Sequence, residues 1–324
     1  LVRCELLSSH AACKEKVMAE RLVGADIAPP DLHAKITGRA RYAEDFRAPG
    51  MVFAKLLLSP MPHARVRRVD ASRALAMEGV IDILRADEVP SRDGPREACL
   101  TDTPRYEGEP ILAVAAVDEE TAAAAIEAIE IDFEPLPFVI DPLESLRPGG
   151  PNAYVDGNQF SGQDGWSDFK WTDTDFAKVD AGEMPDPSCP VEWTKGDPES
   201  AFAESALVLE ETIVHQSLTH HPMEPRSNMA YWEGETLHAF VSTQSSQQTK
   251  FALAGALQID PENINLVSEY CGGGFGSKIA GTTVMQIPAL FSRKINRPVM
   301  LRITRYEENY VGRARPGFQT WLKM

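Results

Sequence analysis

The 324-residue chain lacks long hydrophobic runs and any excess of positive charge. Apolar runs such as Ile111–Val117 fall far short of the roughly 20 residues that a membrane-spanning helix needs. Its 32 Lys and Arg face 48 Asp and Glu, which gives a formal net charge of −16. A surface of that sign repels the phosphates of nucleic acids and the head groups of anionic lipids. We therefore expect no nucleic acid and no membrane among the partners.

Cysteine is also scarce, and its spacing excludes several classes of site. The five cysteines contain no CxxC pair, which argues against a disulfide framework, a zinc site or an iron–sulfur cluster. They are Cys4, Cys13, Cys99, Cys189 and Cys271. The first 21 residues mix charges of both signs and lack the apolar core of a signal peptide. A reducing compartment, the cytoplasm, is expected. Because the chain begins at Leu1 and ends at Met324 inside an alternating apolar run, truncation or subunit splitting stays open.

What the sequence does contain is an alternation of strand and helix patterns, which predicts a mixed α and β fold. The sharpest unit is a buried strand over residues 110–117, an N-cap at Asp118, an alanine-rich helix over 121–127 and a strand over 128–133. From Arg147 to Asp197 this periodicity disappears. We interpret that stretch as an interdomain connector with an insertion, whose Phe169, Trp171 and Phe176 pack on the neighbouring domain. A disordered linker is the alternative.

The pattern resumes after Gly196. It predicts a helix that opens at a capping box, Ser245 to Gln248, and runs to Leu257. It also predicts a helix-like run from Ile279 to Arg293, interrupted at Pro288. The remaining elements are a helix over 198–204 and strands over 207–215, 228–232, 237–241, 263–267 and 299–303.

The strongest local signal is the glycine-rich segment Gly272–Lys278, between a strand and a predicted helix. Glycines let a backbone approach a ligand closely and adopt positive φ, and a helix N-terminus adds amide donors, so an anionic cofactor or substrate is expected. It is not a P-loop, because Ser277 separates Gly276 from Lys278, and Ser277 also occupies the position of the third glycine of the dinucleotide fingerprint. A glycine turn without a ligand is the alternative.

Three nearby features admit two interpretations each. The amide of Gln244, at a strand's end, can bind an oxygen ligand, although such residues more often form turns. In His220–Arg226, Pro222 and Pro225 oppose a helical metal site, and Glu224 with Arg226 is expected as a buried polar pair. Cys271 could be a nucleophile beside the loop, but a packing cysteine is favoured because no base lies at a recognisable spacing.

In their order along the chain, these segments resemble the molybdenum-cofactor-binding large subunit of the xanthine dehydrogenase/aldehyde oxidase family of molybdenum hydroxylases. Some 270 residues are covered, and the ordered set is more specific than any one motif. The matching segments are Lys35–Asp45, Ser59–Arg65, Gly108–Pro110, His221–Arg226, Ser242–Gln244, Gly273–Lys278 and Arg297–Val299.

The resemblance implies an α+β fold, with an α/β hammerhead domain followed by the first part of a mixed α/β molybdopterin-binding domain. The expected organisation is a lead-in over residues 1–35, the hammerhead domain over 36–147, the connector over 148–197 and the truncated second domain over 198–324.

It also implies a molybdopterin-type molybdenum cofactor bound by Gln244, Gly274, Phe275 and Gly276. Gln244 would hydrogen-bond near the apical oxo ligand, while Phe275 and Gly276 would present backbone amides to the metal's oxygen ligands and the pterin. Ile279 stands where purine-oxidising relatives carry a substrate-binding glutamate. The substrate is therefore expected to be an aldehyde, an aromatic N-heterocycle or another small carbonyl compound. The family's general-base glutamate lies outside this chain, so its catalytic residue has no counterpart here.

The function that follows is a component of a hydroxylase that uses water as its oxygen source. Expected partners are the C-terminal half of the molybdenum subunit, an iron–sulfur subunit and an FAD subunit, and the chain by itself is expected to be inactive. Two alternatives stay open: a non-catalytic scaffold without cofactor, and an anion- or nucleotide-binding enzyme that uses the glycine-rich segment alone.

Overall fold

The computed structural model describes residues 24–90, 98–152, 154, 156–161, 165–183, 193–279 and 283–324. The chain divides into two units, Leu1–Arg41 and Tyr42–Met324. The described part of the first unit contains one helix, α2 (Leu32–Ile36). Much of the predicted lead-in lies outside the described residues. Within the described ranges, no helix has the length and apolar character that crossing a bilayer requires.

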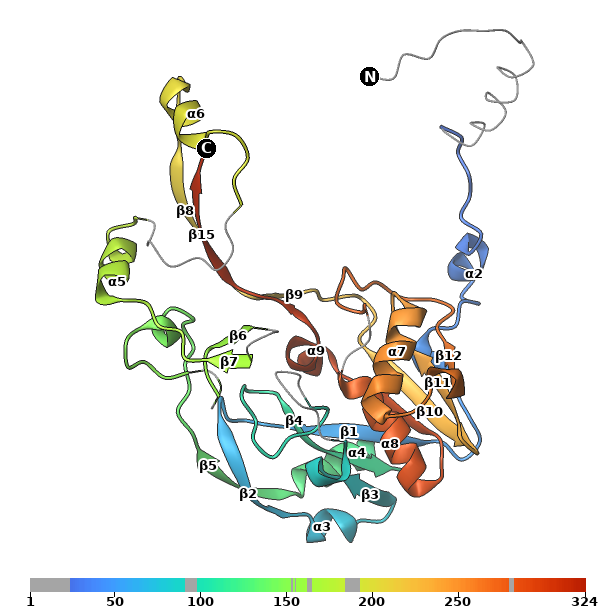
Figure 1. Ribbon diagram of the computed structural model, residues 1–324. Helices are drawn as coiled ribbons and strands as arrows, with labels where there is room; N and C mark the ends of the chain where they lie inside the picture. Colours follow the sequence, from blue (N-terminus) through green and yellow to red (C-terminus); the bar gives the residue numbers. More distant parts are fainter. Residues whose placement is uncertain are drawn as a thin grey trace, which may run out of the picture. The chain divides into compact units, whose positions relative to one another are not determined.

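The second unit is built on a seven-stranded mixed sheet (Figure 1). Its strand order is β12-β11-β10-β13-β1-β4-β3. The strands are β1 (Val52–Leu58), β3 (Val80–Leu84), β4 (Pro110–Ala116), β10 (Ser227–Glu233), β11 (Thr236–Val241), β12 (Ile264–Val267) and β13 (Val299–Arg302). β1 pairs with β13 in parallel, with Val52 opposite Val299. One sheet therefore contains strands from both predicted domains. The boundaries of these domains stay predictions, and the expected α+β class is confirmed.

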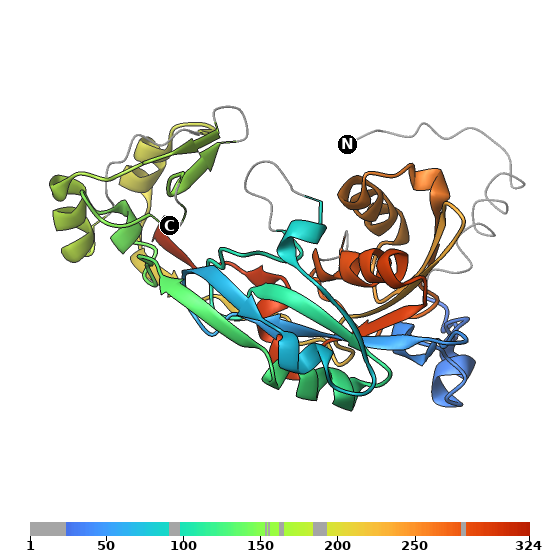
Figure 2. The ribbon, with the colours of Figure 1, turned by 90° about the horizontal axis from the view of Figure 1, so that it is seen from below.

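Helices cover both faces of this sheet (Figure 2). All seven residues of β4 are buried. Its Leu112 and Val114 pack toward α3 (Ser72–Leu75) and α4 (Glu119–Glu127), whereas Ala113 and Ala115 join the core that contains Phe291 of α8 (Gln286–Ile295). The alternation of side chains along a strand explains why a strand buried on both faces is apolar throughout. The predicted cap of α4 is confirmed, since the Asp118 carboxylate accepts a 2.7 Å hydrogen bond from the Thr121 amide.

The strands that lead to the glycine-rich segment are covered by a different helix and a separate apolar cluster. Helix α7 (Ser246–Leu257) packs Leu253 and Ala254 against β10 and β11. On a separate apolar cluster of β10 and β13, Met229 and Met300 contact Phe46, which follows the short helix η1 (Ala43–Asp45).

Smaller pairs of strands surround the main sheet, all antiparallel. They are β2 (Ala64–Asp70) with β5 (Glu130–Pro135), β6 (Gln159–Ser161) with β7 (Gly165–Ser167), β8 (Glu210–His215) with β15 (Phe318–Lys323), and β9 (Leu218–Thr219) with β14 (Ala314–Arg315). The remaining helices are α5 (Asp173–Asp180), α6 (Pro198–Glu204), α9 (Arg305–Val311), η2 (Ala86–Glu88), η3 (Glu144–Leu146), η4 (Pro261–Asn263) and η5 (Thr283–Met285).

The described part of the predicted connector is folded. The Lys170 ammonium donates to three oxygens, the carbonyls of Ser145 and Gly150 and the side chain of Asn152, at 2.6 to 2.8 Å. The Trp171 ring lies 5.8 Å from that of Phe176 and 6.3 Å from that of Trp321 on β15. The predicted packing on the neighbouring domain is therefore confirmed for Trp171, whereas the Phe176 ring packs on Trp171 within the connector itself. The disordered alternative is wrong for the described residues of this stretch.

Two local predictions need correction. The helix expected from Ile279 begins at Gln286, after η5, and Pro288 lies in its first turn, where a missing N–H costs no intrahelical bond. Residues 280–282 of that prediction lie outside the described residues. Helix α7 does have Ser245 at its N-cap, but the predicted capping box does not form. The Ser245 amide donates instead to Thr243 Oγ1 at 3.2 Å.

Phe291 tests the central core. Its side chain is 0% exposed on α8, whereas Phe251 on α7 is 56% exposed. We expect Phe291→Ala to lower the free energy of unfolding by about 3–5 kcal/mol, because it removes apolar contacts and leaves a cavity. Phe251→Ala, the matched control, should change it by less than about 0.5 kcal/mol. Urea unfolding of both variants measures this, and equal losses would contradict the described packing.

Candidate functional site

Two segments that follow neighbouring parallel strands form the site. β11 pairs with β12 in parallel, with Leu237 opposite Ile264. The carboxyl ends of parallel strands lie at one edge of a sheet, where α/β proteins commonly bind ligands. Gln244 follows β11, and Gly272–Lys278, the glycine loop, follows β12. The sheet therefore brings Gln244 and the glycine loop together.

The contact between them runs through the Gln244 carboxamide. Its Oε1 accepts hydrogen bonds from the backbone N–H groups of Gly276, at 3.0 Å, and Lys278, at 3.3 Å. The backbone N–H of Gln244 donates in return to the Lys278 carbonyl at 3.1 Å. No described residue accepts a hydrogen bond from Gln244 Nε2. The acceptor half of the carboxamide thus serves the loop, and the donor half is available to a ligand.

Glycine is required at two loop positions because side chains occupy the space of a Cβ. A Cβ on Gly274 would lie 2.3 Å from Gln244 Oε1, and one on Gly272 would lie 2.5 Å from the Cβ of Glu224. Real Cβ atoms do not approach neighbours so closely. At Gly276 the reason differs: φ is +92°, and a Cβ would meet no atom of the described residues within 4 Å. The described residues therefore leave open space beside the loop at Gly276.

Phe275 is the exposed tip of the loop. It adopts a φ of 51°, unusual for a residue with a side chain, and is 71% exposed. Such a conformation costs about 1–2 kcal/mol and is frequent at functional sites. No described residue accepts a hydrogen bond from its backbone N–H. The Gly276 amide is engaged by Gln244, so the Phe275 N–H is one loop donor that the described residues leave available.

These groups decide what ligand the site fits. The Phe275 N–H and Gln244 Nε2 are donors without a described acceptor, and no described atom would lie within 4 Å of a Cβ on the intervening Gly276. Fixed donors suit the oxygen atoms of an anionic or oxo-bearing group. They do not suit a bare cation, and within the described ranges no three His, Cys, Asp or Glu side chains gather to hold one. The residues present thus fit a cofactor whose oxygens face the loop.

Two electrostatic expectations are corrected. The expected helix N-terminus does not follow the loop directly, since α8 begins at Gln286. Glu224 and Arg226 are both buried, as expected, but they do not pair with each other. Glu224 pairs with Lys278 at 3.0 Å, and Arg226 pairs with Glu308 on α9. Each charge instead meets an opposite charge from a distant segment, which neutralises both within the interior.

The buried side chain of Arg226 contacts the backbone of the glycine loop. Its Nη2 donates to the Ser277 carbonyl at 2.7 Å, and its backbone N–H donates to Glu308 at 3.0 Å. Burial is the main cause that lowers the pKa of Arg226, to about 10, and the nearby Arg313 lowers it further. The guanidinium remains charged at neutral pH. The sequence pattern assigned no role to Glu308 or Lys278, and the signal for Lys278 was a lone cation ending a glycine-rich loop that follows a predicted strand.

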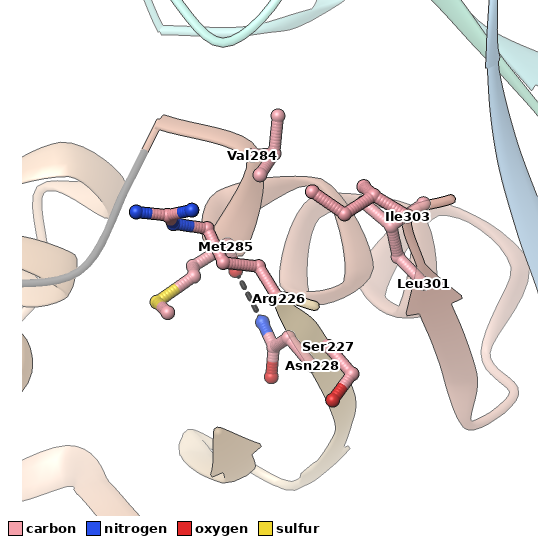
Figure 3. A pocket seen from close by; sticks show the side chains of 7 residues that line it. All are labelled: Arg226, Ser227, Asn228, Val284, Met285, Leu301 and Ile303. Carbon is pink, nitrogen blue, oxygen red and sulfur yellow. Dashed lines mark hydrogen bonds between the residues drawn. The ribbon is translucent and has the colours of Figure 1, made fainter. Parts of the chain in front are cut away.

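A small cavity lies behind Arg226 (Figure 3). Apolar side chains of Val284, Met285, Leu301 and Ile303 form much of its wall, and Asn228 donates to the Met285 carbonyl across it. Arg226 Nε and Asn228 Oδ1 are buried there without a described partner. Ordered water commonly satisfies such atoms. We interpret the cavity as packing behind the loop and not as the ligand site.

The other candidate residues have separate environments. His220 Nδ1 lies 3.0 Å from the Arg313 carbonyl, and His221 is exposed with a φ of 44°. Cys271 is half-buried, with its thiol 3.6 Å from the Gly273 carbonyl. Ile279, at the end of the loop, is 37% exposed.

Two family models match the chain. The aldehyde oxidase and xanthine dehydrogenase a/b hammerhead domain matches residues 37–137, and the molybdopterin cofactor-binding domain matches residues 182–324.

Among curated relatives, a probable xanthine dehydrogenase subunit of Bacillus subtilis is 32% identical over 303 residues, covering 91% of this chain and 36% of that protein. The nicotinate dehydrogenase large molybdopterin subunit of Eubacterium barkeri is 27% identical, covering 91% of this chain and 64% of its own length. The chain thus spans between about a third and just under two thirds of these relatives. A solved CO dehydrogenase from Oligotropha carboxidovorans shares the fold, with a TM-score of 0.77 and 21% identity over 96% of this chain and 38% of that chain.

Gly274→Ala tests the contact between Gln244 and the loop. The added methyl group would displace the Gln244 carboxamide, so the Gly276 amide should lose its acceptor and exchange with solvent at least about tenfold faster. The matched control is Gly255→Ala on α7, where a Cβ meets nothing within 4 Å and alanine favours the helix. Amide hydrogen exchange measures both. Unchanged exchange in Gly274→Ala would contradict the described contact.

Proposed function

Because the chain belongs to the molybdenum-cofactor-binding large subunits of the xanthine dehydrogenase/aldehyde oxidase family, we propose that it holds the oxygen-bearing side of a molybdopterin cofactor in a molybdenum hydroxylase. The observation that carries this proposal is the donor pair at the loop. The Gln244 carboxamide has its oxygen committed to loop amides, and the exposed residue Phe275, whose N–H has no described acceptor, lies on the same loop. When bound, the cofactor supplies a redox centre for oxidising a substrate with water as the oxygen source.

In this proposal the chain's residues bind and orient. Gln244 Nε2 and the Phe275 N–H donate to oxygen atoms of the cofactor, and Gly274 keeps the space that Gln244 needs. Gly276, whose amide was expected to face the cofactor, instead acts indirectly in this proposal, because that amide donates to the Gln244 oxygen. Donors fixed before the cofactor arrives need no reorganisation during the reaction, which is how preorganised dipoles contribute to catalysis.

The proposed substrate is an aldehyde, an aromatic N-heterocycle or a similar small molecule. Ile279 at the end of the loop is apolar and partly exposed, so it offers contact surface and no hydrogen bond to a polar ring. Related proteins that carry such names include the nicotine 6-hydroxylase large subunit of Paenarthrobacter nicotinovorans and the aldehyde oxidoreductase molybdenum-binding subunit PaoC of Escherichia coli.

The proposed partners are the remainder of the molybdenum subunit, an iron–sulfur subunit and an FAD subunit. The lengths support this, since the chain covers 36% of the Bacillus subtilis relative. The sequence offers no CxxC pair for iron–sulfur ligation. We therefore expect no turnover from this chain alone.

Gln244→Glu tests the donor role. A carboxylate can still accept from Gly276 and Lys278, so the loop should keep its shape, but it repels the oxygens to which the amide would donate. In the enzyme assembled with its partners we expect aldehyde-dependent dye reduction to fall by at least about 10²-fold. The matched control is Gln248→Glu, an exposed position on α7, which should leave activity and molybdenum content unchanged. Full activity of Gln244→Glu at normal molybdenum content would refute the proposed role.

A further inference from the structure

One oxygen of a buried carboxylate holds both ends of the glycine loop. Glu224 Oε2 accepts hydrogen bonds from the Gly272 N–H at 2.7 Å and from Lys278 Nζ at 3.0 Å. Gly272 is the first residue of the loop and Lys278 the last. The same oxygen accepts from Ser242 Oγ at 2.8 Å, and Ser242 lies two residues before Gln244. The start of the loop, its end and the segment that carries Gln244 thus meet at a single atom.

Lys278 links this carboxylate to Gln244. Its side chain is fully buried, and its Nζ donates to the Glu224 backbone carbonyl at 2.6 Å as well as to the carboxylate. Its backbone N–H donates to Gln244 Oε1. Its carbonyl accepts from the Gln244 backbone N–H and, at 2.8 Å, from Thr243 Oγ1. Burial lowers the pKa of Lys278, and the Glu224 charge opposes that effect. Fixing the Lys278 side chain therefore fixes the backbone that orients Gln244.

We propose that Glu224 and Lys278 are positioning residues whose buried ion pair closes the glycine loop and sets the direction of the Gln244 amide and the Phe275 N–H. The inference rests on the proposed function for its consequence, but its geometry belongs to the chain alone. Stability does not require such a pair, because well-packed neutral residues often replace a buried ion pair without loss. The Glu224–Lys278 pair instead connects both ends of the loop to the Gln244 carboxamide, and so selects one conformation of the loop among several.

Three variants separate positioning from stability. Lys278→Met leaves the buried Glu224 carboxylate without its cation, and Glu224 Oε1 has no described partner to compensate. The double variant Glu224→Gln/Lys278→Met removes both charges and retains an oxygen that can accept from Gly272 and Ser242. The control is Lys294→Met, since Lys294 also forms ion pairs, with Asp82 at 3.1 Å and Glu88 at 2.7 Å, and lies on α8 away from the loop in sequence.

The first experiment uses the full chain without cofactor, and measures urea unfolding and the exchange of the Gly276 amide. We expect Lys278→Met to lower the unfolding midpoint and to speed exchange of the Gly276 amide at least about tenfold. In the double variant the midpoint should recover while exchange stays fast, because the Nζ contacts that fix Lys278 are still missing. Lys294→Met should lower the midpoint without a selective change at Gly276. If exchange recovers together with the midpoint, or if Lys294→Met has the same selective effect, the pair is merely structural and the inference fails.

A second readout tests the consequence in the enzyme assembled with its partners and cofactor. The double variant should lose at least about tenfold in kcat with KM within about twofold, because misdirected donors weaken interactions made in the transition state. An unchanged kcat despite fast Gly276 exchange would overturn the role of the pair in orienting the site. Failure of the proposed function is distinguishable, since it would leave the assembled unsubstituted enzyme without molybdenum while the exchange result on the free chain still stood.

Discussion

The hydrogen bonds from the Gly276 and Lys278 amides to Gln244 Oε1 are the contact on which the rest of the site depends. They occupy Oε1, the acceptor of the carboxamide, and so leave Nε2, its donor, for another partner. They also explain the composition of the loop. Gly274 must lack a Cβ because Gln244 lies where the Cβ would be, and Phe275 takes a left-handed conformation at the exposed turn that follows. The parallel pairing of β11 with β12 makes this contact possible, because it places the two segments at the same edge of the sheet.

The charges beneath the loop are arranged to cancel. Lys278 and Arg226 are nearly inaccessible to solvent, and each meets a buried glutamate, Glu224 or Glu308. Isolated buried charges would be costly, so the pairing is what allows two cations to be buried next to the glycine loop. The result is a loop whose outward groups are dipoles and not full charges. Under the proposed function, the loop would present amide donors to an oxygen-rich ligand, and its exposed tip, Phe275, is itself uncharged.

Much of the fold was predictable because its signals are local. The apolar run of β4, the alanine-rich α4 and the Asp118 cap are encoded within a few residues of one another, and the structure confirms each. The pairing of β1 with β13 has no such signal, because it joins residues about 250 positions apart in the chain. The Ser245 capping box does not form for a related reason. The Ser245 backbone N–H donates to Thr243 Oγ1, which itself donates to the Lys278 carbonyl. Motif order identified Gln244 and the loop, but the partners of Glu224 and Arg226 depend on tertiary contacts that no spacing encodes.

The same contacts limit what this chain can contribute to chemistry. A general base needs a carboxylate or imidazole that is free to accept a proton near the substrate. Glu224, the carboxylate that contacts the loop, already accepts three hydrogen bonds at Oε2 and lies below the loop against Gly272. Recruiting it as a base would break the ion pair that fixes Lys278 and, through Lys278, Gln244. Under the proposed function, therefore, the loop residues orient the cofactor's oxygens, and a residue outside the glycine loop and its supporting segment removes the proton.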